Sequence, residues 1–119
     1  MAVAAECVAE ICLGLPDAEV ESSTRHRAFK VRGRTFCWLL DDHHGDGRRS
    51  INAKASPGEN ARLAAEAAER FFVPDHLGAR GWVGLWIDAG ETGLDDVERT
   101  VLESYLLVAP KRLAASLRD

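Results

Sequence analysis

The stretch AFKVRGRTFCWLLDD, from Ala28 to Asp42, decides the fold class of this sequence. Two runs rich in apolar, aromatic and β-branched residues flank Arg32 and Gly33, and glycine supplies the positive φ that a tight hairpin turn requires. Strands joined by so short a connection pair antiparallel. The stretch therefore predicts a β-hairpin with its turn at these two residues.

Further strands are predicted around this hairpin. The segment EVESS (residues 19–23) precedes it, SINAK (50–54) follows it after the polar loop HHGDGRR (43–49), and WVGLWID (82–88) alternates as a later strand. Alternation with period two sends neighbouring side chains to opposite faces of a sheet. These segments would extend the hairpin into one antiparallel sheet.

A helix is predicted ahead of the strands. Val3, Cys7 and Ile11 form an apolar stripe at helical spacing, which indicates a helix over residues 2–13. The segment has acids inside its apolar part and lacks a basic start, so we do not interpret it as a signal peptide.

Two longer helices are expected to begin with capping boxes, in which a Ser or Thr caps backbone N–H groups and an acid three residues later reaches back. The two pairs are Ser56 with Glu59, and Thr92 with Asp95. The apolar face of the second helix is predicted to comprise Val97, Val101, Leu102, Tyr105, Leu106 and Val108. Pro110 interrupts this helix, and a short final helix is expected over residues 111–119.

The predicted order of elements is α-β-β-β-β-α-β-α. Strands that follow in a run, without alternating with helices, indicate an α+β fold, here an antiparallel sheet of about five strands with helices packed on one face. The chain has 119 residues, 46% of them hydrophobic, which is enough for one core. With no internal repeat and no Pro/Gly/Ser-rich linker, residues 1–119 are expected to form a single domain.

The predicted strands separate apolar side chains from polar and aromatic ones. The face away from the helices would collect Lys30, Arg32, Asn52, Lys54, Trp82 and Trp86. Arg34 lies beside this set at the hairpin turn, and Lys111 and Arg112 would extend it if the last helix folds beside the sheet edge. The candidate nucleic-acid-binding residues are therefore Lys30, Arg32, Arg34, Lys54, Trp82, Trp86, Lys111 and Arg112.

Cations combined with aromatic planes have two interpretations. Single-stranded nucleic acids are held in this way, with bases stacked on rings at about 1–3 kcal/mol each. Alternatively, Lys and Arg stems cover the indoles and form cation–π contacts without any ligand. The net charge of −4 speaks against a generally basic surface, whereas the acid-free segment RHRAFKVRGR (25–34) predicts a local positive patch.

The loop DDHHGDG (41–47) has the composition of a metal site but not its spacing. If Asp42, His44 and Asp46 are aligned with positions 1, 3 and 5 of a calcium loop, position 12 is Ala53, where a bidentate Glu is required. A zinc site would need further ligands from distant histidines. We interpret the segment as a solvated loop whose tandem histidines make its charge sensitive to pH, and we expect no metal.

No residue pattern in the sequence indicates catalysis. It has no G-x-S-x-G nucleophile motif and no glycine-rich phosphate loop. Cys7, Cys12 and Cys37 form no C-x-x-C pair and are expected to be buried, inert thiols in a reducing cytoplasm. His76 is interpreted as a hydrogen-bond partner that anchors its loop. We therefore expect no enzymatic activity and no cofactor.

Four phrases together resemble the MmcQ/YjbR family of small bacterial proteins. They are LGLPDAEVE (13–21), AFKVRGRTFCWL (28–39), DHLGARGWVGLWID (75–88) and LLVAPKRLA (106–114). The resemblance implies a fold similar to that of frataxin and CyaY, sometimes described as a double-wing DNA-binding fold. Members of the family are commonly labelled DNA-binding.

The frataxin relation also raises the question of iron, which frataxins bind through a dense acidic ridge. The acids available here are Glu6, Glu10, Asp17, Glu19 and Glu21. They are interspersed with alanine and cysteine, and hard cations need several convergent oxygen ligands, so no iron site is expected.

The expected function is non-catalytic binding, in first place weak binding of nucleic acid through the basic and aromatic sheet face. The alternative is a protein-interaction or accessory module that uses the same face. We expect a cytoplasmic monomer or homodimer without membrane association, since no apolar run approaches the ~20 residues that span a bilayer.

Overall fold

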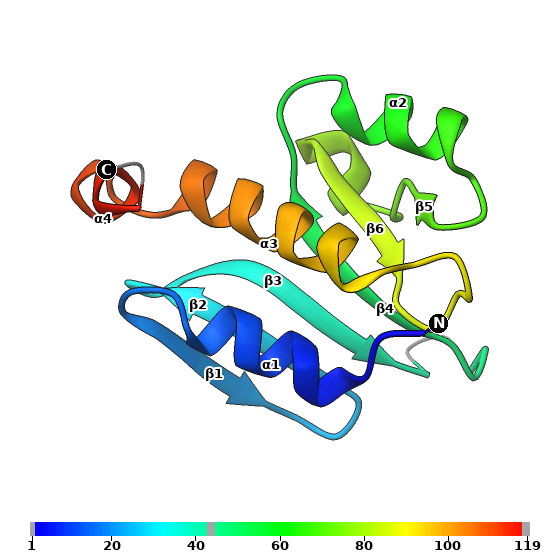
Figure 1. Cartoon of the computed structure of the whole chain (residues 1–119), viewed down its shortest axis with the longest axis horizontal. Helices are drawn as coiled ribbons and strands as arrows, with labels where there is room; N and C mark the ends of the chain where they lie inside the picture. Colours follow the sequence, from blue (N-terminus) through cyan, green and yellow to red (C-terminus); the bar gives the residue numbers. More distant parts are fainter. Residues whose placement is uncertain (1, 43–44, 118–119) are drawn as a thin grey trace.

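The computed structural model describes residues 2–42 and 45–117, which form an α+β fold (Figure 1). The elements follow in the order α1 (Ala5–Leu13), β1 (Ala18–Ser22), β2 (His26–Val31), β3 (Arg34–Asp41), β4 (Arg49–Lys54), α2 (Glu59–Glu66), β5 (Phe71–Phe72), the 3-10 helix η1 (Leu77–Arg80), β6 (Trp82–Trp86), α3 (Leu94–Val108) and α4 (Lys111–Ser116). The predicted fold class and the order of its main elements are confirmed.

All strands of the sheet pair antiparallel, in the spatial order β1-β2-β3-β4-β6-β5. The sheet has six strands where about five were predicted. The additional strand is β5, whose two residues pair with Leu85 and Gly84 of β6. So short a strand carries no alternation that a sequence could reveal.

The predicted hairpin between β2 and β3 is confirmed. Arg32 has φ of 50° and Gly33 has φ of 81°, and two consecutive positive φ values are the signature of a type I′ turn. A β-bulge follows in β3, because Phe29 pairs with Cys37 whereas Lys30 pairs with Thr35.

The hydrophobic core lies between one face of the sheet and helices α1 and α3, which run across that face (Figure 1). Leu63 of α2 packs against the same core from beside β5 and β6. The fully buried large side chains include Val8, Phe29, Val31, Phe36, Ile51, Val83, Leu85, Ile87, Val97, Val101 and Tyr105. The expectation that helices pack on one face is met.

Helix α1 buries a different face from the predicted one. It begins at Ala5, because Val3 is extended and its N–H donates to the carbonyl of Ile87 at 2.8 Å. The buried helical residues are Val8, Ala9 and Cys12. Cys7 is exposed, so the prediction that all three thiols are buried is wrong for this residue.

Both predicted capping boxes are displaced, because their Ser and Thr hydroxyls bind elsewhere. Thr92 donates to the carbonyl of Trp86 at 2.6 Å, and α3 begins after Gly93, whose N–H donates to Asp96. Ser56 donates to Glu103 at 3.4 Å, and α2 begins after Gly58, which has φ of 83°.

Helix α3 also buries polar residues, which the spacing of apolar residues in the sequence cannot predict. Ser104 is fully buried; its hydroxyl donates to the carbonyl of Phe36 at 2.6 Å and accepts from the N–H of Lys54 at 2.9 Å. These groups belong to β3 and β4 next to the bulge, so the helix completes the hydrogen bonding of the sheet. Leu102, predicted on the apolar face, is 41% exposed.

Candidate functional site

The sheet has a second face, which α1 and α3 do not cover. In β2, β3, β4 and β6, residues that alternate with the buried core positions point to this side. We call it the helix-free face, and its residues are His26, Ala28, Lys30, Trp38, Leu40, Ser50, Asn52, Lys54, Phe72, Trp82, Gly84 and Trp86. All three tryptophans of the chain lie on it.

Three of the candidate residues lie together on this face, at the end of the sheet that carries the β2–β3 turn. Lys54 and Trp82 are direct cross-strand partners, and Lys30 lies on β2 at the same end. Trp86 is four residues farther along β6, opposite Ser50, and therefore at the other end of the sheet. The structure thus separates Trp86 from the lysines with which the sequence grouped it.

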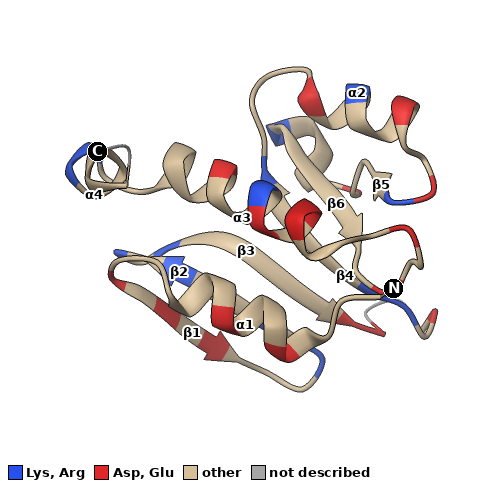
Figure 2. Ribbon diagram, viewed as in Figure 1, with Lys and Arg blue, Asp and Glu red and all other residues tan. Residues whose placement is uncertain are grey.

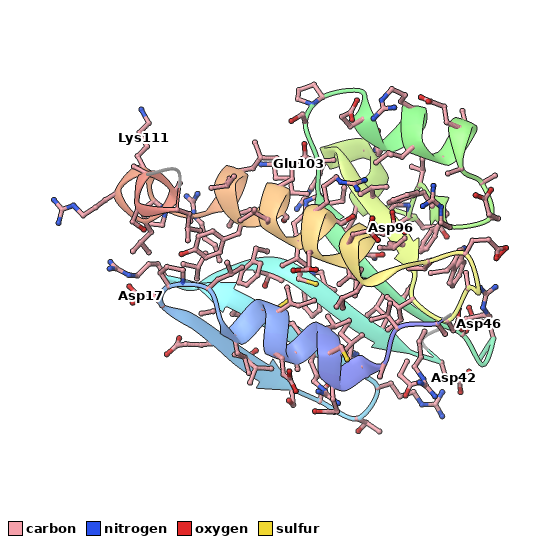
Figure 3. The ribbon with its side chains drawn as sticks, in the orientation of Figure 1. Asp17, Asp42, Asp46, Asp96, Glu103 and Lys111 are labelled. Atoms are coloured by element: carbon pink, nitrogen blue, oxygen red, sulfur yellow. The ribbon has the colours of Figure 1, made fainter. Side chains whose placement is uncertain are left out.

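Three of the four remaining candidate residues line a groove beside the hairpin turn. Arg32, Arg34 and Lys111 line this groove of about 870 Å³, whose other walls come from the α3–α4 junction. Arg34 pairs with the core residue Val31, which places it on the helix side of the sheet. Figure 3 shows Lys111 and Asp17 at the same end of the molecule. Arg112 is exposed on α4 next to Lys111.

Two of the candidate cations are paired with acids. Lys30 Nζ lies 3.3 Å from a carboxylate oxygen of Glu21, and the Arg32 guanidinium lies 2.8 Å from Asp17. Acids line β1, whereas cations mark α4 (Figure 2). Within residues 2–42 and 45–117, the candidate cations without an ion pair are Arg34, Lys54, Lys111 and Arg112.

The opposite end of the helix-free face is hollowed into a cavity of about 500 Å³. Its aromatic walls are Trp38, Phe72 and Trp86. The β3–β4 loop contributes Asp46 and Arg48, and the segment 73–77 after β5 closes another side. The sequence predicted an uncovered sheet face, and this segment shows that the face is partly covered at this end.

Trp86 is flanked by two side chains that hold its indole in place. The Phe72 ring stacks on it with centroids 4.3 Å apart and an interplanar angle of 28°, and the Arg48 guanidinium lies 4.1 Å from the indole centroid. Phe72 reaches this position because Gly84 has no side chain: a Cβ there would overlap the ring. The predicted cation–π cover therefore exists for Trp86, but Arg48 provides it.

Arg48 is fixed by Asp88. Its guanidinium donates to both carboxylate oxygens, with distances of 2.9 and 3.1 Å. Partial burial opposes ionisation of Asp88, but the bonds from Arg48 and from the N–H of Arg49 outweigh it and lower the pKa of this carboxyl. Asp88 in turn raises the pKa of Arg48. The cation over Trp86 is thus already ion-paired.

The floor of the cavity is polar and buried. Ser50 and Asn52 of β4 are only 5% and 6% exposed. Among the residues that the structure describes, Asn52 Oδ1 has no hydrogen-bond donor. Buried amide oxygens are nearly always paired in folded proteins, so this acceptor is an exception in the sheet.

The bend before β6 is anchored by Asn60. Its amide donates to the carbonyls of Gly78 and Trp82 at 2.9 and 3.0 Å. His76, which was predicted to anchor this loop, instead adopts a φ of 63° and lines the cavity. Asn60 carries no sequence signal for this role, because it reaches the bend from α2.

The sequence also missed several residues of the cavity. Trp38 was not assigned to a face, although the alternation of β3 places it next to Asn52 on β4. Phe72 and Arg48 could not be assigned to the cavity from the sequence, because Phe72 follows the end of a helix and Arg48 lies at the end of a loop. Trp82 and Trp86 are both half-buried, so each keeps an accessible edge.

The described part of the chain contains no cluster of three or more His, Cys, Asp or Glu side chains that could hold a metal ion. His43 and His44, on which the predicted pH-sensitive loop rests, lie outside the described residues. In residues 2–42 and 45–117, no helix is long and apolar enough to cross a membrane.

Comparisons with known proteins place the chain in a family. The YjbR family model matches residues 13–107. A crystal structure of the Deinococcus radiodurans protein DR2400, which carries the family domain DUF419, is similar with a TM-score of 0.67 and 21% identity, over 82% of this chain and 72% of that one. A search of curated proteins found no match. Because the family model spans most of the sequence, the chain belongs to the YjbR family.

Proposed function

We propose that this protein is a non-catalytic binding protein that holds single-stranded nucleic acid weakly on its helix-free face. The observation that carries the proposal is the position of the tryptophans: all three lie on the face that α1 and α3 leave uncovered. Two of them line a cavity, and the third is paired across the strands with a lysine that has no acidic partner among the described residues.

The two ends of the helix-free face have different roles in this proposal. At the cavity end, one base packs against Trp38 and the accessible edge of Trp86, since contact with aromatic rings is favourable for every base. At the other end, Lys54 contacts the backbone and Trp82 supplies a second stacking surface, because the pair shares one register position. Four intervals of about 3.3 Å along β6 separate the two tryptophans, a span that a few nucleotides can bridge.

Tryptophan emission tests this proposal directly. A short mixed-sequence single-stranded DNA should quench the emission at low salt, and the quenching should weaken steeply as salt rises, because phosphate contacts release counterions. Lys54→Ala should weaken binding and flatten the salt dependence. Arg99→Ala is the matched control, since this exposed cation lies on α3, on the other side of the molecule. Unchanged emission at high micromolar DNA and low salt would contradict the proposal.

A protein partner on the same face is the second candidate. The observation that favours it is charge: two of the candidate cations are ion-paired, and the net charge is −4. A partner side chain in the cavity would bury Trp86, and interface energy concentrates in buried aromatics. This candidate predicts association that Trp86→Ala abolishes and that salt hardly changes. A monomer that captures no partner at any salt concentration would count against it.

A further inference from the structure

A groove of about 870 Å³ lies between the β2–β3 turn and the junction of α3 and α4. Its walls are mostly aliphatic, because they come from residues 106–110 at the junction and from Ala114 and Ala115 of α4. Leu107 is 42% exposed and Ala115 is also exposed, so apolar surface remains open to a partner. The volume is near the upper end of the roughly 300–1,000 Å³ that ligand clefts occupy.

Both sides of the groove are held in place by the fold. One side is the hairpin turn at Arg32 and Gly33, which paired strands continue in both directions. On the other side, Pro110 separates α3 from α4, and α4 packs inward through Leu113 and Ala114. The groove therefore exists without a partner, and a partner binds without first ordering it.

All three charged residues that line the groove are cations, and no described Asp or Glu lines it. The charge of Arg32 is already paired with Asp17 at 2.8 Å. Arg34 has no ion pair with a described residue, and it is exposed beside the aliphatic walls. Figure 3 shows the Lys111 side chain extending outward from α4, where its flexible stem can bring the ammonium to a group bound at the edge of the groove. This combination selects an anionic group on an apolar body.

The chemistry of the lining favours a peptide over a nucleic acid. No aromatic ring of the described residues lines this groove, so the bases of a nucleic acid would find no surface on which to stack. Aliphatic walls instead bury aliphatic side chains, and a guanidinium binds a carboxylate through two parallel hydrogen bonds. A peptide with acidic residues on either side of apolar ones supplies both groups along one chain.

We propose that the groove is a docking site for an acidic peptide segment of a partner protein. Apolar side chains of the segment pack against Leu107 and the α3–α4 junction, one carboxylate binds Arg34, and a second meets Lys111 at the edge of the groove. Arg34 lies on the helix side of the sheet, so this site is apart from the helix-free face. The inference therefore goes beyond the proposed function and does not depend on it.

A display library of random linear peptides, selected on the intact protein, tests the docking site. The enriched sequences should combine Asp or Glu with Leu, Ile or Phe, and they should be lost when the selection is repeated on Arg34→Glu. An enriched peptide, synthesised and titrated by NMR, should shift the backbone signals of Arg34 and of residues 106–115. Its affinity should fall at least about tenfold in Arg34→Glu, because a like charge then faces its carboxylate.

Matched variants separate the groove from general effects of charge and apolar surface. Arg99→Glu makes the same charge change at an exposed residue of α3 outside the groove, and it should leave the affinity unchanged. Leu107→Ser should weaken the peptide several-fold, because an apolar contact is lost. Leu102→Ser should not, although this leucine is 41% exposed on the same helix. All four side chains are exposed, so circular dichroism should show that each variant folds.

Equal enrichment on the intact protein and on Arg34→Glu, or an equal loss of affinity in Arg99→Glu, would overturn the inference. So would an enriched peptide whose shifts fall on the helix-free face, or self-association that Arg34→Glu abolishes, which would make a second copy the occupant. Single-stranded DNA that binds the helix-free face while no acidic peptide is enriched would refute this inference alone. An acidic peptide in the groove without any binding of DNA would refute only the proposed function.

Discussion

At the residue scale, two buried asparagines differ in how far the protein satisfies their hydrogen bonds. Asn60 is buried and donates to two carbonyls of the bend before β6. Asn52 is equally buried, but its oxygen has no donor among the described residues. Strand alternation was sufficient to predict the face on which Asn52 lies. Its lack of a partner could not be predicted, because it depends on how the segment 73–77 encloses the cavity.

This contrast predicts opposite effects on stability. Asn52→Leu should leave the free energy of unfolding unchanged or raise it, because it removes an unpaired buried acceptor. Asn60→Leu should lower it by about 2–3 kcal/mol, because two buried carbonyls lose their donor. Urea denaturation of both variants measures the difference. A loss for Asn52→Leu as large as that for Asn60→Leu would show that Asn52 is a structural residue.

Ser104 carries a second prediction at this scale. Its hydroxyl serves the carbonyl of Phe36 and the N–H of Lys54. Ser104→Ala should destabilise the protein by about 2–4 kcal/mol, because a carbonyl and an N–H of the sheet are left unpaired beside the core. Ser116→Ala is the control, since its exposed hydroxyl bonds only within α4, and should have little effect. Equal denaturation midpoints for the two variants would contradict this account.

At the scale of elements, the hairpin was predictable and the helix starts were not. Arg32 and Gly33 determine the β2–β3 turn locally, through positive φ, so the sequence alone indicated it. Thr92 and Ser56 matched capping patterns, but their hydroxyls bind Trp86 and Glu103. Such contacts come from the tertiary fold, and a local pattern cannot contain them.

The packing of Phe72 of β5 over Gly84 of β6 predicts that Gly84 does not tolerate a side chain. In Gly84→Ala the new Cβ would overlap the Phe72 ring, so the ring must leave and its stack on Trp86 is lost. We expect a loss of about 1–3 kcal/mol in stability, as for other overpacked sites, together with a changed near-ultraviolet circular dichroism signal. A Cβ at Gly90 meets no atom within 4 Å, so Gly90→Ala is the matched control. Unchanged aromatic signals in Gly84→Ala would contradict the packing described for Phe72.

At the scale of the whole molecule, the structure separates features that the sequence grouped together. The helix-free face joins Lys54 and Trp82 at one end and the cavity with Trp86 at the other. Arg34 and Lys111 lie around a groove on the helix side instead. Alternation predicts the face of a residue but not its distance along the sheet, and the position of α4 depends on packing across the whole core. The fold was therefore more predictable than the site.

The buried thiols predict a loss of stability at alkaline pH. The interaction of Cys37 with the Cys12 thiol, together with burial, raises the pKa of Cys37 well above its ordinary value. The folded state then keeps this proton, while the unfolded thiol loses it above about pH 8.5. Stability should fall by about 1 kcal/mol as the pH rises from about 7.5 to 9.5 through this group alone. Urea denaturation at both pH values measures this loss of stability. The Cys37→Ala variant should lose less stability between the two pH values than the unmodified protein. An identical pH dependence in the variant would contradict the role of this thiol.

The central claim is that the helix-free face is the binding surface, and an NMR titration with single-stranded DNA at two salt concentrations tests it most directly. The account predicts that the largest shifts fall on the indole signals of Trp38, Trp82 and Trp86 and on the backbone of β4 and β6, and that they shrink as salt rises. Shifts confined to α1 and α3, or no shifts at low salt, would contradict it.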